Sequence, residues 1–315
     1  MKGKSVQQKR FRRLLIALLA ALAVLCVSYF IAAQMEGSAS GFGNGAVPLS
    51  ASPDSGSGFT VYFLDVGQAD GAVACSDGHY MLIDGGNTDD SRLLYTFLKQ
   101  HGIKHLDYVI GTHAHEDHIG AVPGALRYAT AGKVYCPETE YDTRAFNNFL
   151  KAVADQGLSP VKPVPGETFE LGSSLVEILA PINFDTEDQN SLSIVLKITY
   201  GQTSFLFTAD AGRDTEKDIL AAGYDIDCTV LKVGHHGSEY STTYPFLREI
   251  MPEYAVISVG KDNDYGHPTD AVLSKLRDAD VSVYRTDLNG TIVCKSDGKT
   301  VTIIPDKGSA FLFGS

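Results

Sequence analysis

The chain has 315 residues, of which 44% are hydrophobic and 31 are Gly. This length and apolar fraction are those of a globular protein with one large domain or two small ones, and they exclude collagen, coiled coils and wholly disordered chains. The formal net charge is −12 and the five cysteines are scattered without a CxxC pair, which argues against a broadly basic nucleic-acid-binding surface, a zinc ribbon and a dense disulfide framework.

The N-terminal part of the chain is predicted to be a membrane anchor. Residues 1–13 form a basic tail with six Lys and Arg residues, and no acidic residue precedes Glu36. Residues 14–33 contain Ser28 as their only clearly polar residue, and a helix of this length spans about 30 Å, one bilayer core. The basic tail is expected to stay in the cytoplasm, which places the rest of the chain outside, in a single-pass topology at the cell membrane. The alternative is a signal peptide cleaved near Ala33 or Ser38, which would give a secreted protein.

The composition changes after the apolar segment. Residues 34–58 are rich in Gly, Ser, Ala and Pro without periodicity, so we expect a flexible linker, followed by the folded body over residues 59–315. Beyond the basic tail the chain carries 20 basic and 38 acidic residues, a formal charge of −18. Binding of a polyanion to such a body requires metal ions or a local basic patch.

Short β-rich runs alternate with helical stretches through the body, which predicts an α/β fold with helices covering sheet faces. Predicted strands cover residues 59–66, 80–83, 107–110, 191–199, 203–208, 228–233, 254–259, 281–284, 291–294 and 301–304. Predicted helices cover residues 91–100, 119–128, 242–250 and 269–278, with a further short helix capped by Asp214. The turn-like residues 200–202 predict a hairpin between the strands that flank them.

Six of the nine histidines fall in three short segments, each directly after a predicted strand, where α/β proteins gather their site residues. The first segment packs three imidazoles together with Asp117 into six residues. In a loop, His113 and His115 can point at one metal ion while Asp117 and His118 reach a neighbouring one. Imidazole and carboxylate suit zinc, manganese or iron. An isolated histidine is usually structural, but chance does not explain a cluster this dense.

The second segment, residues 235–238, has the sequence His-His-Gly-Ser. In the functional interpretation one imidazole and Ser238 face a metal ion or a substrate phosphate, and Gly237 opens the turn for close approach. In the structural alternative this is a strand-end turn with a hydrogen-bonding histidine. We favour catalytic roles for His235 and His236, and we expect His235 to be the more buried of the two.

Charged residues at other strand ends admit two interpretations each. Asp65 and Asp70 follow the first predicted strand, and they either support the site or its substrate, or belong to an ordinary turn. Lys232 precedes the second histidine segment, and it is either an anchor for an anionic substrate or a solvated lysine at a strand edge.

Several segments together resemble one known family. Residues 112–118 match the HxHxDH signature of the metallo-β-lactamase superfamily. The segments that resemble successive motifs of its ComEC-type branch are residues 63–70, 82–86, 207–210, 231–238, 258–268 and 285–287. That branch includes the extracytoplasmic hydrolase domain of a DNA-uptake protein. The resemblance covers the whole predicted body, from about Phe59 to the C-terminus.

The resemblance implies an αββα sandwich with two divalent metal ions, Zn²⁺ or Mn²⁺, at one edge. The residues that it makes metal ligands are His113 and His115 at the first ion, Asp117 and His118 at the second, Asp210 between the two ions, and His267 at the second ion. It also implies that Asp84 orients a ligand rather than touching metal.

The chain departs from the superfamily pattern at one position. A third histidine of the first site is expected shortly before the strand that leads to Asp210, and residues 185–191 contain none. Asn190, Asp188 or His235 are the candidates to replace it. The first site is therefore expected to be weaker, or to hold a harder metal than zinc.

These observations predict a metal-dependent extracytoplasmic hydrolase. Two divalent ions about 3.5 to 4 Å apart can share a water, lower its pKa towards 7 and bind both the attacking and the departing oxygen. The nucleophile is then hydroxide. The favoured substrate is a phosphodiester, either DNA, which makes the chain a nuclease and a candidate partner of the DNA-uptake machinery, or a cell-surface polymer such as one bearing phosphorylcholine. The alternatives are a lactonase-type hydrolase and a metal-containing binding module without turnover; the oligomeric state is not indicated.

Overall fold

The computed structural model describes residues 58–138 and 140–311. The predicted basic tail, membrane anchor and most of the linker lie outside the described residues, so they stay predictions. Within the described part of the chain, no helix is both long and apolar enough to cross a membrane.

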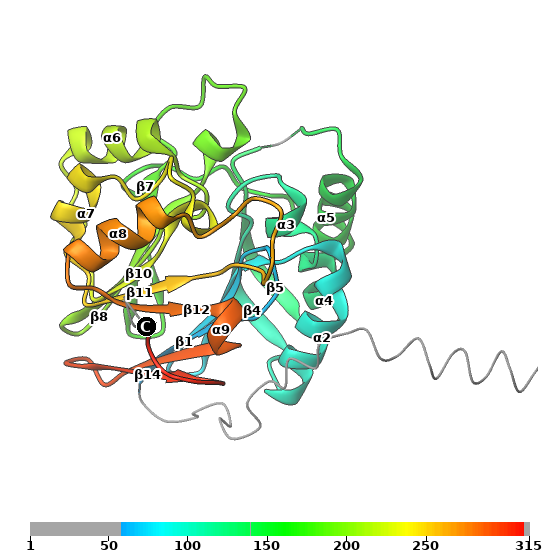
Figure 1. Cartoon of the computed structure of the whole chain (residues 1–315). Coiled ribbons are helices and arrows are strands. Elements are labelled where there is room, and N and C mark those ends of the chain that lie inside the picture. Colours follow the sequence, from blue (N-terminus) through cyan, green and yellow to red (C-terminus); the bar gives the residue numbers. More distant parts are fainter. Residues whose placement is uncertain (1–57, 139, 312–315) are drawn as a thin grey trace, which may run out of the picture. The chain divides into compact units, whose positions relative to one another are not determined.

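Two mixed seven-stranded sheets form the body (Figure 1). The first sheet has the strand order β14 (Val301–Pro305), β13 (Ile292–Ser296), β1 (Phe59–Phe63), β2 (Gly71–Ser76), β3 (His79–Gly85), β4 (His105–Ile110) and β5 (Thr130–Tyr135). The second sheet has the order β12 (Ser282–Arg285), β11 (Tyr254–Ile257), β10 (Val230–Lys232), β9 (Thr203–Phe207), β8 (Val195–Tyr200), β7 (Ser174–Ala180) and β6 (Thr168–Leu171).

Helices pack on the outer face of each sheet (Figure 1). The first sheet is covered by α2 (Ser91–Gln100), α3 (Glu116–Ile119), α4 (Val122–Leu126) and α5 (Arg144–Asp155). The second is covered by α6 (Arg213–Ala222), α7 (Tyr244–Ile250) and α8 (Asp270–Asp278). The remaining helical turns are η1 (Thr88–Asp90), η2 (Gln189–Leu192), η3 (Gly234–Gly237) and α9 (Thr286–Asn289).

Three apolar cores hold these layers together, and β1 shows how the sequence builds them. Its alternate residues Phe59, Val61 and Phe63 lie in the core between the two sheets. Tyr62 points the other way, into the core beneath the helices, where its ring meets that of Phe97 edge-on with 5.3 Å between centroids. Period-two alternation with both faces buried is what an internal strand of a layered sandwich requires. The expected αββα sandwich is thus confirmed.

Most predicted elements are present, with differences at their ends. The hairpin is confirmed, since Tyr200 pairs with Thr203 across a turn in which Gly201 has φ of 61°. The strand predicted over residues 59–66 ends at Phe63, because the chain turns at Gly67, whose φ is 67°. Asp214 is not a cap: it lies in the first turn of α6, which Gly212 caps.

The sheet topology brings several strand ends to one edge. Strands β3 and β4 are parallel neighbours in the first sheet, and β9, β10 and β11 are parallel neighbours in the second. Their carboxyl ends lead into the histidine- and aspartate-bearing segments, so residues far apart in the sequence meet there, as is usual for site residues of α/β proteins.

Candidate metal centre

The end of β3 supplies a carboxylate that organises the first histidine segment. Asp84 has a left-handed φ of 55°, and its side chain is buried. Its Oδ1 accepts a hydrogen bond from the Thr112 amide at 2.8 Å, and its Oδ2 accepts from the Thr112 hydroxyl at 2.7 Å. Oδ2 also lies 2.8 Å from Nδ1 of His118. A histidine held through Nδ1 presents its Nε2, which is how a carboxylate orients a metal-binding imidazole.

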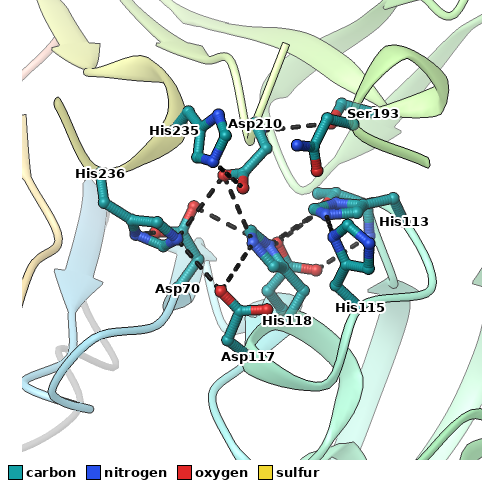
Figure 2. A network of polar contacts seen from close by, with 12 residues as sticks. Asp70, His113, His115, Asp117, His118, Ser193, Asp210, His235 and His236 are labelled. Atoms are coloured by element: carbon teal, nitrogen blue, oxygen red, sulfur yellow. Dashed lines mark hydrogen bonds and ion pairs between the residues drawn. The ribbon is translucent and has the colours of Figure 1, made fainter. Parts of the chain in front are cut away.

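Four side chains from three segments converge on one point (Figure 2). Asp117, His118, Asp210 and His236 each offer an atom, and these atoms lie within 4.8 Å of one another. Nε2 of His118 is 3.3 Å from Oδ1 of Asp210, and Nε2 of His236 is 3.3 Å from Oδ2 of Asp117. We refer to these four residues as the four-residue group.

The atoms of this group fit a divalent metal ion. Nε2 of His118 and Oδ1 of Asp210 are buried and have no hydrogen-bond partner among the described residues. Buried polar atoms are normally hydrogen-bonded, so two facing atoms without such partners suit a cation bound between them. A set of imidazole nitrogens and carboxylate oxygens suits zinc or manganese.

A second set of donors lies beside the four-residue group. Nε2 of His113 is 3.0 Å from Nδ1 of His115, and the rings of His113 and His118 have centroids 4.0 Å apart. On the other side, Nε2 of His235 is 3.4 Å from Oδ2 of Asp210. Asp210 therefore directs one oxygen at the four-residue group and the other at His235 (Figure 2).

Burial and close charges shift the titration of these groups. Burial disfavours the charged form of His118, but the carboxylates of Asp210 and Asp84 outweigh it and raise the pKa of His118 well above its ordinary value. Burial also opposes ionisation of Asp210, yet His118 and His236 hold its pKa well below the usual range. Burial likewise opposes the charge of His236, but Asp210 and Asp70 raise its pKa to about 10. A divalent cation would compete with protons for these same atoms.

His236, and not His235 as we expected, is the more buried of the two adjacent histidines. His236 is 2% exposed and belongs to the four-residue group, whereas the side chain of His235 is 28% exposed. Left-handed φ values of 50° and 53° at the two residues, followed by 87° at Gly237, turn His236 inward. Its Nδ1 contacts the carbonyl of Ser258 at 3.0 Å. The expectation that His235 is the more buried residue was wrong, because the left-handed backbone at both residues turns His236 inward instead.

The side chain of Lys232 is buried in the site. It is 3% exposed, so it is not a solvated lysine at a strand edge. Its Nζ lies 2.5 Å from Oδ2 of Asp70 and donates to the carbonyl of Val233 at 3.0 Å. The ammonium group is therefore paired with a buried carboxylate of the site, and a contact of Lys232 with an anionic substrate stays a prediction. This ion pair places Asp70 in the site. Asp65 lies elsewhere, and its backbone amide donates a hydrogen bond to the hydroxyl of Thr291.

The remaining predicted residues are not members of the four-residue group. His267 is outside it, with its ring 5.7 Å from that of His235. Asn190 lies on η2 with its Oδ1 buried, and it has no hydrogen-bond partner for that atom among the described residues. Ser193, at the end of η2, accepts a hydrogen bond from the amide of Asp210 at 3.2 Å. Ser238 closes the histidine turn through its amide, which donates to the carbonyl of His235 at 2.9 Å.

One residue of the site surroundings was not found from the sequence. Glu138 is buried, and its Oε1 accepts a hydrogen bond from the amide of Ala114, between His113 and His115. Burial raises its pKa to about 7. It follows β5, a strand that the sequence did not reveal, so no local pattern pointed to it.

Comparisons with known proteins place the chain in a family. The family model described as the metallo-beta-lactamase superfamily matches residues 64–261. ComE operon protein 3 of Bacillus subtilis is 34% identical over 201 residues, covering 64% of this chain and 26% of that protein. Competence protein ComA of Neisseria gonorrhoeae is 28% identical over 242 residues, covering 76% of this chain and 32% of that protein.

The match to these relatives and to solved structures concerns the folded body. The chain spans about a quarter to a third of the length of the curated relatives it matches. The metallo-beta-lactamase fold protein YhfI from Bacillus subtilis superposes with a TM-score of 0.53 at 14% identity, over 76% of this chain and all of that one, which shows the same fold. With the family model covering well over half of its length, the chain belongs to the metallo-beta-lactamase superfamily, with competence proteins among its relatives.

Proposed function

We propose that this chain is a metal-dependent phosphodiesterase, specifically a nuclease, that acts outside the cytoplasm. The observation that carries the proposal is the four-residue group, in which His118 Nε2 and Asp210 Oδ1 face each other without hydrogen-bond partners among the described residues.

Two ions can be assigned to residues of this edge. Asp117, His118 and His236 would hold one ion together with Asp210, and His113 and His115 would hold the other beside it. Asn190, whose buried Oδ1 has no hydrogen-bond partner among the described residues, is our candidate for an amide oxygen in place of the third histidine of the first site. When bound, such ions act as Lewis acids on a phosphoryl group and lower the pKa of water towards 7.

The protein's own residues orient the metal-binding imidazoles and contact the substrate. Asp84 fixes the ring of His118, and the carbonyl of Ser258 fixes that of His236, so both present Nε2 to the same point. His235 lies at the solvent side of Asp210, partly exposed, and is placed to donate a hydrogen bond to a substrate oxygen. The described cysteines are all buried, which supports hydrolysis by water rather than by a thiol nucleophile.

A phosphodiester is favoured because two divalent ions offset the negative charge of both the acidic protein and its substrate. The relatives named as competence proteins support DNA as that substrate and the DNA-uptake machinery as a partner. Cell-surface polymers with phosphodiester bonds are the second candidate. The predicted anchor at residues 14–33 would hold the body at the outer side of the membrane, within reach of either substrate.

The test is hydrolysis of bis(4-nitrophenyl) phosphate by the full chain, stripped with a chelator and resupplied with zinc or manganese. We expect turnover only with metal, and we expect Asp117→Ala to reduce it to the metal-free rate. Asp155→Ala is the matched control, because Asp155 is an exposed aspartate on α5 paired with Lys151, and it should leave turnover unchanged.

The outcome of this assay also determines which substrates are tested next. Turnover would be followed by assays on single- and double-stranded DNA and on phosphorylcholine esters. If neither metal gives turnover of any phosphodiester, the proposal is wrong. Hydrolysis of a lactone by the same samples would then indicate a lactonase, and metal binding without hydrolysis of any ester would indicate a binding module.

A further inference from the structure

A buried ion pair lies directly beneath the four-residue group. Lys232, at the end of β10, has its Nζ 2.5 Å from Oδ2 of Asp70, which precedes β2 in the other sheet. The two side chains are almost fully buried, at 4% and 7% exposure. Buried ion pairs contribute little to stability compared with apolar side chains of similar volume, so their presence calls for another role.

Asp70 contacts both segments that supply the four-residue group on this side. Its Oδ1 lies 3.3 Å from Nδ1 of His236, on the ring edge opposite to the one that faces Asp117 and Asp210. Its backbone amide donates to the carbonyl of Asp117 at 3.0 Å. Asp70 therefore joins the histidine turn to the loop of the first histidine segment. Figure 2 shows it beside His236, on the side that faces His118.

The ammonium group also fills a place that a metal ion could take. Asp70, Asp84 and His118 form a second set of potential ligands, and all three are buried. In this set Nδ1 of His118 is bound to Asp84, and the cation that faces Asp70 is the ammonium of Lys232. A fixed internal cation leaves the Nε2 side of the two histidines as the place where divalent ions bind.

We propose that Lys232 and Asp70 act together as positioning residues for His236 and thereby set the metal affinity of the four-residue group. The carbonyl of Ser258 accepts the hydrogen bond from Nδ1 of His236, and Asp70 lies against the same edge of the ring, where it adds negative charge. Lys232 holds Asp70 in place and balances its charge. The inference rests on the proposed function only in requiring that the four-residue group binds metal; it does not depend on the substrate.

The test measures zinc binding to the full chain by competition with a chromophoric chelator, without any substrate. Partners that orient a metal-binding histidine typically change metal affinity 10- to 100-fold. We therefore expect Asp70→Asn to weaken one of the two bound zinc equivalents by roughly 10- to 100-fold. The loss should persist when the other set of donors is weakened by His115→Ala, which assigns it to the four-residue group.

Two further variants separate positioning from folding. Lys232→Met leaves Asp70 buried and unpaired, so this variant is expected to melt at a lower temperature and could fail to fold. The double variant Asp70→Asn/Lys232→Met has no unpaired charge and should fold, and we expect it to keep the lowered zinc affinity. The matched control is Lys197→Met, which removes another buried strand lysine, paired with Asp227 away from the metal centre. It should lower the melting temperature and leave zinc affinity unchanged.

These measurements distinguish a positioning role of the Lys232–Asp70 pair from a role in folding alone. If wild type binds two zinc ions and both Asp70→Asn and the double variant bind them as tightly, the positioning role is wrong while the metal centre stands. If the double variant regains wild-type affinity, the pair serves folding only, and the inference is again wrong. If wild type binds neither zinc nor manganese, the metal centre and this inference fail together.

Discussion

Asp84 controls the centre through three hydrogen bonds made by one buried carboxylate. It holds both the amide and the hydroxyl of Thr112, and it fixes the Nδ1 edge of His118. Its left-handed φ is one that aspartate and asparagine adopt more readily than most residues. A side chain in this place therefore fixes both the loop that carries His113 and the direction of the His118 ring.

Replacement of Asp84 by Asn tests that role with little change in shape or backbone preference. The amide keeps one acceptor but loses the charge that orients His118, so we expect zinc affinity to fall about 10- to 100-fold. The far-ultraviolet circular dichroism of the chain should stay that of wild type. Unchanged zinc affinity in this variant would show that Asp84 is structural only.

Glu138 makes stability depend on pH. Burial raises its pKa from an ordinary 4.5 to about 7, so the folded state prefers the protonated form. Its contribution to stability is fully present below about 4.5 and is lost as the pH rises through about 7.

The matching variant is Glu138→Gln, which stays neutral at every pH. In metal-free protein we expect urea unfolding to give nearly equal stabilities for variant and wild type at pH 4.5. At pH 8 the variant should be more stable by roughly 3 kcal/mol, since the shift from 4.5 to about 7 is about 2.5 pKa units and one unit is about 1.4 kcal/mol. A difference between the two proteins that does not change with pH would contradict this interpretation.

The residues of the centre were predictable to different degrees. The first histidine segment was found because its donors are contiguous in the sequence and too dense for chance. The buried position of His236 and the pairing of Lys232 with Asp70 were not, because they depend on left-handed backbone at positions 235 and 236 and on two different sheets meeting at one edge. No local pattern carries that information.

At the scale of elements, the loop after the histidine turn is held between two helices. Glu216 on α6 accepts hydrogen bonds from the amides of Thr242 and Thr243, at 2.5 and 2.9 Å. Lys275 on α8 donates to the carbonyls of Ser241 and Thr242, at 3.0 and 2.9 Å. Thr242 has a left-handed φ of 51°, so the loop needs these contacts to keep its conformation.

Removal of the Glu216 carboxylate should therefore be costly. Glu216→Ala leaves two amides without their acceptor and removes the stronger of the two countercharges of Lys275. We expect the free energy of unfolding to fall by about 2 to 4 kcal/mol. Denaturation in urea measures the change. Lys217→Ala, at an exposed neighbouring position on α6, serves as the control and should lie within about 0.5 kcal/mol of wild type. Equal effects of the two substitutions would refute the role of Glu216.

The elements themselves were predicted unevenly. The helix predicted over residues 91–100 has those bounds in the structure, because its apolar residues recur at helical spacing. Strand β2 was not predicted, since its sequence GAVACS consists mostly of small residues with weak strand preference, and its neighbours β1 and β3 determine its conformation. Helix α5 and strands β5 to β7 were also missed.

At the scale of the whole molecule, the alternation of strands and helices indicated an α/β fold but not the number of sheets. The αββα sandwich came from the family resemblance, and the two seven-stranded sheets and the family match confirm it. The sandwich matters for function because it brings loops from both sheets to one edge. Asp117 comes from the first sheet's side, and Asp210 and His236 come from the second.

Metal should therefore stabilise the fold by joining the two halves of the sandwich. A ligand at 100 times its dissociation constant adds about 2.7 kcal/mol, which in a domain of this size corresponds to roughly 5 to 10 °C in melting temperature. We expect thermal denaturation of chelator-stripped protein to shift upward by about that amount on addition of zinc. The Asp210→Asn variant should lose most of the shift. An identical melting temperature with and without zinc would contradict a centre shared between the sheets.

The central claim is that two metal ions at this edge enable hydrolysis of phosphodiesters. Its most direct test is the rate of bis(4-nitrophenyl) phosphate hydrolysis by the stripped chain, measured as zinc or manganese is added in small steps. The account predicts a rate that is negligible without metal, rises with metal and levels off near two equivalents. A rate that does not depend on added metal, or no hydrolysis at any metal content, would contradict it.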